Sequence, residues 1–284
     1  TDSVLGWRRH ISGKGLSESN YASMVQKAFR PEWWNGSQVV QIDAAGKRTV
    51  VSQPATLSSN QYTQMEANFS LFFGLALQLY QATLVSDQTP FDKYLEGNTA
   101  ALTAEQQQGF AVFMSKGKCI NCHGGAAFTN AAIERKLIGT ERLSQMLMGN
   151  GATAVYDEGF YNIGVRPTLD DLGAGGKDPF GNPLAMSALA QISNTKVKEL
   201  VGINPNLTVS PGERIAVNGM FKTPTLRNIE LTGPYFQNGG AATLHQVVEV
   251  YNRGGNFPDQ NLPDLDADIT PLGLPGAAKT ARGG

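Results

Sequence analysis

The chain has 284 residues, of which 41% are hydrophobic and 17% are charged, and its formal net charge at pH 7 is −1. This length can bury the core of one large domain or two ordinary ones. The near-neutral charge gives no reason to expect a nucleic acid or a membrane surface as a partner. The longest apolar stretch, residues 71–80, is about half as long as a bilayer-spanning helix, so no membrane span is predicted.

The N-terminal third predicts two helices and one small hairpin. Residues 17–29 begin with a serine cap, Ser17, and carry apolar residues at helical spacing. Residues 39–42 and 49–52 flank an Ala-Gly-Lys turn, which is typical of a β-hairpin. Residues 63–83 are hydrophobic on nearly all sides, so we expect this helix to be buried.

A capping box, Thr103-Ala104-Glu105-Gln106, opens a predicted helix that ends at Gly117. Directly after it comes Cys119-Ile120-Asn121-Cys122-His123, which holds the only two cysteines and one of the three histidines. The pattern C-x-x-C-H is the attachment site of a c-type haem. The two thiols can form thioether bonds to the vinyl groups at one porphyrin edge, and the imidazole can bind the iron. We therefore predict one covalently bound haem c on Cys119, Cys122 and His123.

Three other kinds of site could contain these cysteines, but each fits the motif less well. A zinc site needs four ligands, and only His10 and His245 remain to complete one. A thioredoxin-like dithiol expects a βαβ context and leaves the histidine unexplained. A structural disulfide is the plainest alternative.

The second half of the chain has few periodic segments. Residues 164–183 are rich in Gly, Pro and Asp, which predicts a surface or binding loop or, more plainly, a solvated connector. A helix is expected from Thr243. The proline-containing stretch 258–284 predicts an irregular tail that wraps the surface or frays.

Several runs carry a family resemblance. They are the T-P-x-L-R-N run at 223–228, the run 231–236, and Tyr-Asn-Arg-Gly-Gly at 251–255. Taken with the C-x-x-C-H motif, they resemble the C-terminal haem domain of the bacterial di-haem cytochrome c peroxidase and MauG family. The resemblance implies a mainly α, cytochrome c-like haem domain at 61–257, with long loops and a small β-hairpin. Residues 1–60 would be an interdomain extension packing on it, and residues 258–284 the irregular tail.

The resemblance also implies a function. Family members carry two C-x-x-C-H motifs; the N-terminal haem reacts with peroxide and the C-terminal haem passes electrons to it. This chain has one motif, so it resembles the electron-transfer half of such an oxidoreductase, whose peroxide-reactive haem lies on an N-terminal domain or chain. The alternative is a mono-haem electron carrier without peroxidase activity, although a simple carrier needs only about a hundred residues.

Partners and location follow from the same resemblance. We expect a redox partner protein, with a homodimer as a further assembly. Since bacterial c-type haems are attached outside the cytoplasm, the location would be periplasmic or extracellular. Residues 1–5 lack signal-peptide features, so a targeting segment would have been removed or would lie upstream.

Tyr251 is the candidate sixth ligand of the iron, because it stands where relatives place a methionine or, in MauG-like members, a tyrosine. Leu244, Val247, Val248 and Tyr251 are expected on one face of the helix. A phenolate stabilises ferric or higher-valent iron, whereas a thioether favours ferrous iron. A hydrogen-bonded core tyrosine is the alternative.

Other sixth ligands remain open. The methionine candidates, most of which would be core residues, are Met146, Met148, Met186 and Met220. His10 and His245 would allow bis-histidine ligation, but His245 falls on a different helix face from Tyr251.

Three further residues or runs follow from the resemblance. Thr232-Gly233-Pro234 matches a pair of backbone carbonyls, those of Thr232 and Pro234, that bind calcium at the domain interface together with an asparagine of the N-terminal domain; a plain turn is the alternative. Arg227 could pair with a haem propionate or form a structural ion pair. Gln237 stands where many relatives have histidine.

Overall fold

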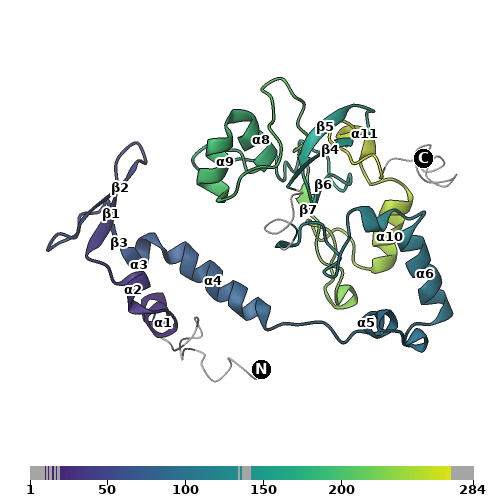
Figure 1. The fold of residues 1–284 in the computed structure, drawn as a ribbon, viewed down its shortest axis with the longest axis horizontal. Coiled ribbons are helices and arrows are strands. Elements are labelled where there is room, and N and C mark those ends of the chain that lie inside the picture. Colours follow the sequence, from purple (N-terminus) through teal and green to yellow (C-terminus); the bar gives the residue numbers. More distant parts are fainter. Residues whose placement is uncertain are drawn as a thin grey trace. The chain divides into compact units, whose positions relative to one another are not determined.

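The computed structural model describes residues 20–133, 135 and 142–269, together with His10, Ser12, Gly15 and Ser17. The chain divides into two compact units, unit 1 (Thr1–Val85) and unit 2 (Ser86–Gly284). Unit 1 holds the first four helices and one sheet, and unit 2 holds the remaining elements (Figure 1). The expected end of the extension, residue 60, falls inside unit 1 between two of its strands.

Unit 1 is built from short helices around a small sheet. Its helices are α1 (Tyr21–Ala28), α2 (Pro31–Trp34), α3 (Gln64–Ala67) and α4 (Phe69–Ala82), and its strands are β1 (Gln38–Ile42), β2 (Arg48–Ser52) and β3 (Gln61–Thr63). The sheet is antiparallel in the order β2-β1-β3. The predicted hairpin is confirmed as β1–β2, and β3 was not predicted. The cap predicted at Ser17 is wrong, because Asn20 caps α1 by accepting the Ser23 N–H at 2.8 Å.

The predicted burial of the 63–83 helix is wrong for most of α4. Only Phe72 is buried, with its ring centroid 4.8 Å from that of Phe29. Leu71, Leu79 and Tyr80 are more than half exposed. The short helices α1 to α3 cover only one side of α4, so hydrophobicity on all sides did not produce burial on all sides.

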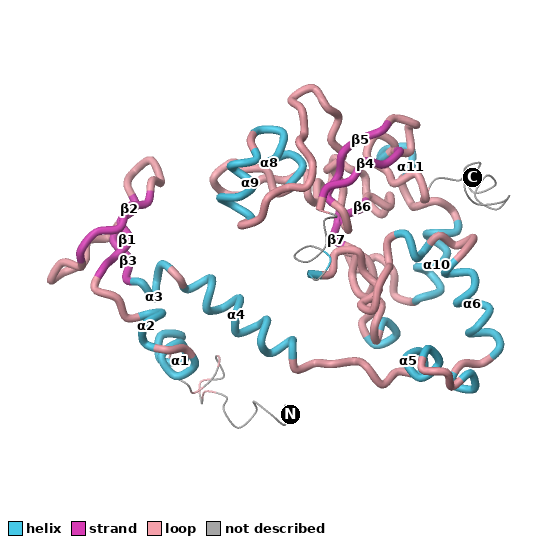
Figure 2. The backbone as a smooth tube through the Cα atoms, viewed as in Figure 1, coloured by secondary structure: helices cyan, strands magenta, loops and turns pink. Residues whose placement is uncertain are grey.

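Unit 2 has many loops between short elements (Figure 2). Its helices are α5 (Pro90–Leu95), α6 (Ala104–Met114), α8 (Met186–Ile192), α9 (Asn194–Val201), α10 (Leu244–Asn252) and α11 (Pro258–Asn261). Its strands are β4 (Leu143–Leu147), β5 (Thr153–Asp157), β6 (Phe160–Tyr161) and β7 (Phe221–Lys222). The predicted capping box of α6 is confirmed, and α10 begins with a similar box from Thr243 and Gln246. Helices with small sheets are confirmed, but the β content exceeds the one predicted hairpin, because β4–β5 and β6–β7 form two further antiparallel pairs.

The β4–β5 hairpin divides two hydrophobic clusters. Leu143 and Val155 face one cluster, which includes Leu189 and Val197 of α8 and α9. The alternate residues of the hairpin, among them Tyr156, face a second cluster against which Cys122 packs. Because successive strand residues point to opposite faces, one hairpin supplies both cores and brings the second to the C-x-x-C-H motif.

The start of the predicted irregular tail is part of the core. Residues 258–261 form α11, and Asn261, Leu265 and Asp266 are buried. The Asn261 side chain accepts from Thr168 at 2.6 Å and from Asn162 at 2.9 Å, which ties it into unit 2. The tail prediction is therefore wrong for 258–269, and residues 270–284 lie outside the described part.

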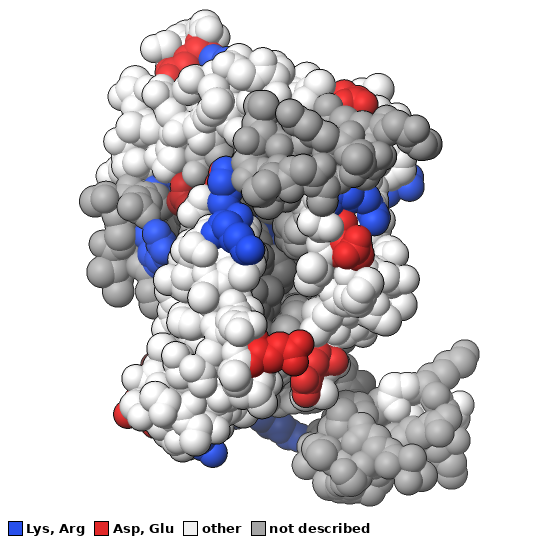
Figure 3. All heavy atoms as spheres, turned by 90° about the vertical axis from the view of Figure 1, so that its right-hand side faces the viewer, with Lys and Arg blue, Asp and Glu red and all other residues white. Residues whose placement is uncertain are grey.

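No helix in the described ranges is long and apolar enough to cross a membrane. On the face drawn in Figure 3, basic and acidic side chains form small separate groups.

Replacing Phe72 by Ala should destabilise unit 1 by about 3–5 kcal/mol, because it leaves a cavity at the only buried position of α4. The matched control on the same helix is Leu79→Ala, whose side chain is 64% exposed and whose loss should cost less than about 0.5 kcal/mol. Hydrogen exchange of the α4 amides with denaturant measures both. Equal losses would contradict the assigned packing of α4.

Candidate haem-binding site

The C-x-x-C-H motif forms a tight turn after α6. Residues Cys119–Asn121 make one turn of 3-10 helix, preceded by Lys118 in the left-handed conformation at φ 55°. The His123 N–H closes the turn on the Cys119 carbonyl at 2.8 Å. The two cysteines are free thiols and not a disulfide. Burial raises the pKa of both thiols, and the nearby Asp266 raises that of Cys122 further.

The imidazole of His123 is held by a backbone carbonyl. Its Nδ1 lies 2.9 Å from the carbonyl oxygen of Phe128. A carbonyl only accepts, so Nδ1 carries the proton and the Nε2 lone pair is left for a metal. Burial lowers the pKa of His123, and the carbonyls of Phe128 and Pro224 partly oppose this. The neutral imidazole is the form that binds a metal.

Asn130 fastens the motif to the rest of unit 2. Its backbone N–H donates to the Cys122 carbonyl at 3.0 Å, and its Nδ2 donates to the Asn121 carbonyl at 2.5 Å. Its Oδ1 accepts the Gly124 N–H at 3.3 Å. One carboxamide thus satisfies the backbone on both sides of the cysteine and histidine. The sequence analysis missed it, because a lone asparagine after the motif carries no local signal.

A buried carboxylate lies next to this turn. Glu158 accepts hydrogen bonds from the hydroxyls of Tyr156 at 2.5 Å and Tyr161 at 2.8 Å, and from Asn130 Nδ2 at 3.3 Å. Burial raises the pKa of both tyrosines. Tyr161 lies near Cys122 and partly opposes the rise in the pKa of its thiol.

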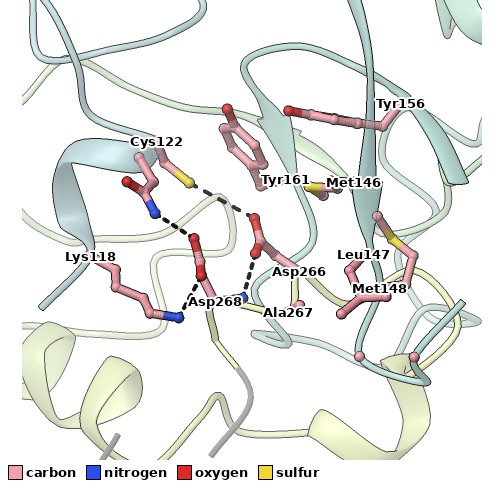
Figure 4. Close-up of a pocket in the computed structure, with 13 residues that line it drawn as sticks. Lys118, Cys122, Met146, Leu147, Met148, Tyr156, Tyr161, Asp266, Ala267 and Asp268 are labelled. Atoms are coloured by element: carbon pink, nitrogen blue, oxygen red, sulfur yellow. Dashed lines mark hydrogen bonds and ion pairs between the residues drawn. The ribbon is translucent and has the colours of Figure 1, made fainter. Parts of the chain in front are cut away.

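A cavity of about 490 Å³ opens beside Cys122, between the motif and β4 (Figure 4). The Cys122 thiol points into it toward Asp266, 3.9 Å away. Burial raises the pKa of Asp266 to about 6. Asp268 closes one side by pairing with Lys118 and Asn121, each at 2.7 Å.

Tyr251 approaches the motif from α10. It is half-buried, and burial followed by the nearby Cys122 and Cys119 raises its pKa. The Tyr251 hydroxyl makes no hydrogen bond among the described residues, so the hydrogen-bonded core tyrosine is not observed there. Val248 is 63% exposed, so its predicted place on the inner face is wrong; Val250 is buried instead.

The alternative sixth ligands lie in different parts of the structure. Met146, Met148 and Met220 belong to the cluster that contacts Cys122, whereas Met186 packs against the other one. His10 and His245 are exposed, and His10 Nδ1 lies 2.6 Å from the Ser12 hydroxyl. Within the described ranges, no three His, Cys, Asp or Glu side chains gather as a metal site.

Arg227 forms a structural ion pair, which was the alternative to a contact with a haem propionate. Its Nη2 and Nη1 donate to the two Asp92 oxygens at 2.9 and 3.0 Å, and its Nε donates to the Ala126 carbonyl at 2.8 Å. Its guanidinium carbon lies 5.8 Å from the centroid of the Phe128 ring. Both partners of the pair are largely buried, with side chains 22% and 14% exposed. Contact with a haem propionate stays a prediction.

The candidate calcium ligands lie in an exposed turn. Thr232 and Pro234 follow the 3-10 turn Ile229–Leu231, and the Thr232 hydroxyl donates to the Ile229 carbonyl at 3.2 Å. The two backbone carbonyls named in the sequence analysis would supply only part of a calcium coordination shell.

The chain is similar in sequence to known proteins. No protein-family model matches the sequence. The chain is 33% identical over 215 residues to cytochrome-c peroxidase IdrP1 of Denitromonas iodatirespirans, covering 70% of this chain and 44% of that protein. It is 25% identical over 268 residues to the methylamine utilization protein MauG of Methylorubrum extorquens, covering 94% and 57%. Its homologues are cytochrome c peroxidases and MauG proteins.

The matches cover only part of each relative. A cytochrome c551 peroxidase of Nitrosomonas europaea is 29% identical over 178 residues, covering 63% of this chain and 36% of that protein. The chain thus spans about half the length, or less, of the curated relatives it matches. A solved structure of a MauG-like protein associated with microbial copper homeostasis aligns with 68% of this chain and 45% of that one, at 23% identity and a TM-score of 0.38, which is too low to assign a fold.

Replacing Asp92 by Asn should lower the stability of unit 2 in a pH-dependent way. Hydrogen bonds from Arg227 and Thr89 hold the pKa of Asp92 well below its ordinary value. A depressed folded-state pKa stabilises the protein above the unfolded-state pKa, about 4, and this stability is lost as the pH falls toward the folded-state value. The difference in denaturation midpoint between the wild type and Asp92→Asn should therefore be large at pH 7 and shrink below about pH 4. A pH-independent difference would contradict this account.

Proposed function

We propose that this chain is the c-type haem electron-transfer half of a di-haem cytochrome c peroxidase-like oxidoreductase. It would hold one haem c through Cys119 and Cys122, with His123 and Tyr251 as axial ligands. It would relay electrons to or from a peroxide-reactive haem on an N-terminal domain or chain. The observation that carries the proposal is that Tyr251 lies near the two free thiols of the C-x-x-C-H motif.

The donor set fits a covalent haem. Both thiols are unbonded, as thioether formation requires. The Phe128 carbonyl fixes the His123 tautomer that exposes Nε2. Tyr251 has no competing hydrogen bond among the described residues. A cytochrome c-like fold for residues 61–257 is part of this proposal.

When bound, the haem would supply a reversible one-electron couple. The chain's own groups would set its preferred oxidation state. A tyrosine ligand binds as the phenolate and stabilises ferric iron, and it must release its proton on binding. The raised pKa of Tyr251 means that this proton is held until the metal displaces it.

The absent partner would supply the peroxide chemistry. Leu71, Phe73, Leu77 and Leu79 of α4 in unit 1 are exposed apolar side chains, and exposed apolar surface is typical of interaction sites. This supports a partner domain or chain. A redox partner protein, a homodimer and a periplasmic or extracellular location belong to the same proposal. Calcium would bind the Thr232 and Pro234 carbonyls only when that partner completes the site.

Haem attachment is tested by intact mass of the chain produced with a c-type haem maturation system. We expect the mass of one covalent haem per chain, and none in the double variant Cys119→Ser, Cys122→Ser. Wild-type chain without covalent haem would overturn the proposal. The carrier alternative is separated by recovering the protein from its native source: a second haem chain or domain favours the di-haem oxidoreductase, and its absence favours the carrier.

Replacing Tyr251 by Phe should abolish a tyrosinate-type low-spin EPR signal of the ferric haem, because Phe cannot bind iron. The matched control is Tyr235→Phe, another partly buried tyrosine of unit 2, whose hydroxyl donates to the Ile229 carbonyl at 2.9 Å. The control should keep the wild-type signal. A Tyr251→Phe spectrum identical to wild type would assign the sixth ligand elsewhere, with Met146 the first candidate because it lines the cavity beside Cys122.

A further inference from the structure

We propose that Asp92 is a positioning residue for the iron ligand His123, acting through Arg227 and Phe128. Asp92 lies on α5, far from the haem motif in sequence, and no family motif pointed to it. The haem-based test of this inference rests on the proposed function. The contacts that support the inference lie within this chain and do not involve the haem.

The first step is the carbonyl of Phe128. This oxygen lies 2.9 Å from Nδ1, and it favours the Nδ1–H tautomer and orients the His123 ring, to which the Pro224 carbonyl also hydrogen-bonds. A histidine that donates its second N–H to a carbonyl becomes a stronger metal donor. Any loosening of Phe128 would therefore weaken the donation from His123 to iron.

The second step is that Phe128 needs support. Its φ of 51° lies in the left-handed region, which a residue with a Cβ adopts only when its surroundings hold it. Locally it has one backbone bond, from its N–H to the Gly125 carbonyl at 3.0 Å. Its ring packs edge-on against Phe91 of α5 and Phe113 of α6, with centroids 5.1 and 6.1 Å apart. Arg227 adds a third contact on the ring, with its guanidinium carbon 5.8 Å from the centroid.

The third step is the clamp that Asp92 makes on Arg227. Arg227 lies over the Phe128 ring and also binds the carbonyl of Ala126, two residues earlier in the same loop. The two carboxylate oxygens of Asp92 grip the guanidinium in a bidentate pair, which fixes orientation as well as charge. Asp92 is itself fixed, because its Oδ2 accepts the Thr89 hydroxyl at 2.6 Å. Three successive contacts thus join α5 to the imidazole.

The test measures the midpoint potential and ferric EPR signal of the haem-loaded full chain. Asp92→Asn should weaken the clamp and raise the potential, with a change in the ferric-to-ferrous ratio of up to about tenfold at fixed potential, or about 59 mV for one electron. Arg227→Lys should shift it in the same direction, because lysine keeps the charge but cannot form the bidentate pair. The low-spin g-values should change in both variants.

Two control variants separate positioning from other effects. Asp170→Asn removes a carboxylate from the exposed pair with Arg166 and reports the effect of charge alone. Asn206→Ala removes the hydrogen bonds to the start of β4 and reports the effect of destabilising unit 2. Neither should move the potential appreciably. An unchanged potential and unchanged g-values in Arg227→Lys would overturn the proposal, even if the potential of Asp92→Asn shifts. The shift in Asp92→Asn would then come from the lost negative charge alone.

A second readout needs no haem. In the haem-free full chain, ¹⁵N-histidine NMR should show His123 as the Nδ1–H tautomer, assigned by comparison with His10→Gln and His245→Gln. Asp92→Asn should give a mixture of tautomers. An unchanged single tautomer would overturn the proposal. If the wild type takes up no haem, the proposed function fails, and this measurement still decides the role of Asp92.

Discussion

The candidate site depends on one constraint: the turn that bears Cys119, Cys122 and His123 must be held mainly by groups other than their reactive atoms, while the two thiols stay free of a disulfide. A buried turn has backbone groups that need partners, and its own functional side chains cannot provide them. The structure meets this need from the residues just beyond the motif. Asn130 bonds the carbonyls of Asn121 and Cys122 and the N–H of Gly124. Phe128 gives its carbonyl to the imidazole.

The rest of unit 2 then follows from where those residues are anchored. The hydroxyl of Thr129 donates to the Thr223 carbonyl at 2.6 Å, which joins the motif loop to the run 223–228. Asn130 reaches Glu158 at the end of the β4–β5 hairpin. Asp266, beyond α11, faces Cys122 across the cavity. Segments separated by more than a hundred residues therefore meet around one turn.

Local signals were predictable from sequence and distant ones were not. The capping box of α6 and the haem motif depend on neighbouring residues, so their patterns could be read directly. Asn130 and Asp92 act on groups brought near only by folding, and no spacing rule marks them. The buried start of the tail was missed because proline and aspartate suggest exposure, whereas Asn261 and Asp266 are buried with hydrogen-bonded side chains. In α4 the apolar pattern predicted burial, but it carried no information about which elements would pack against the helix.

The chemistry around the motif points toward oxidised iron more than toward a high-potential carrier. A phenolate from Tyr251 would add negative charge to the iron, and the Phe128 carbonyl would strengthen donation from His123. Asp266 adds a carboxylate beside Cys122 that is ionised above about pH 6. All three act in the same direction, because negative charge near the iron stabilises its higher oxidation states. A simple carrier needs only a potential matched to its partners, whereas a station that passes oxidising equivalents benefits from this bias. With Tyr251 as the sixth ligand, the donor set would therefore suit an oxidised-state haem better than a high-potential carrier.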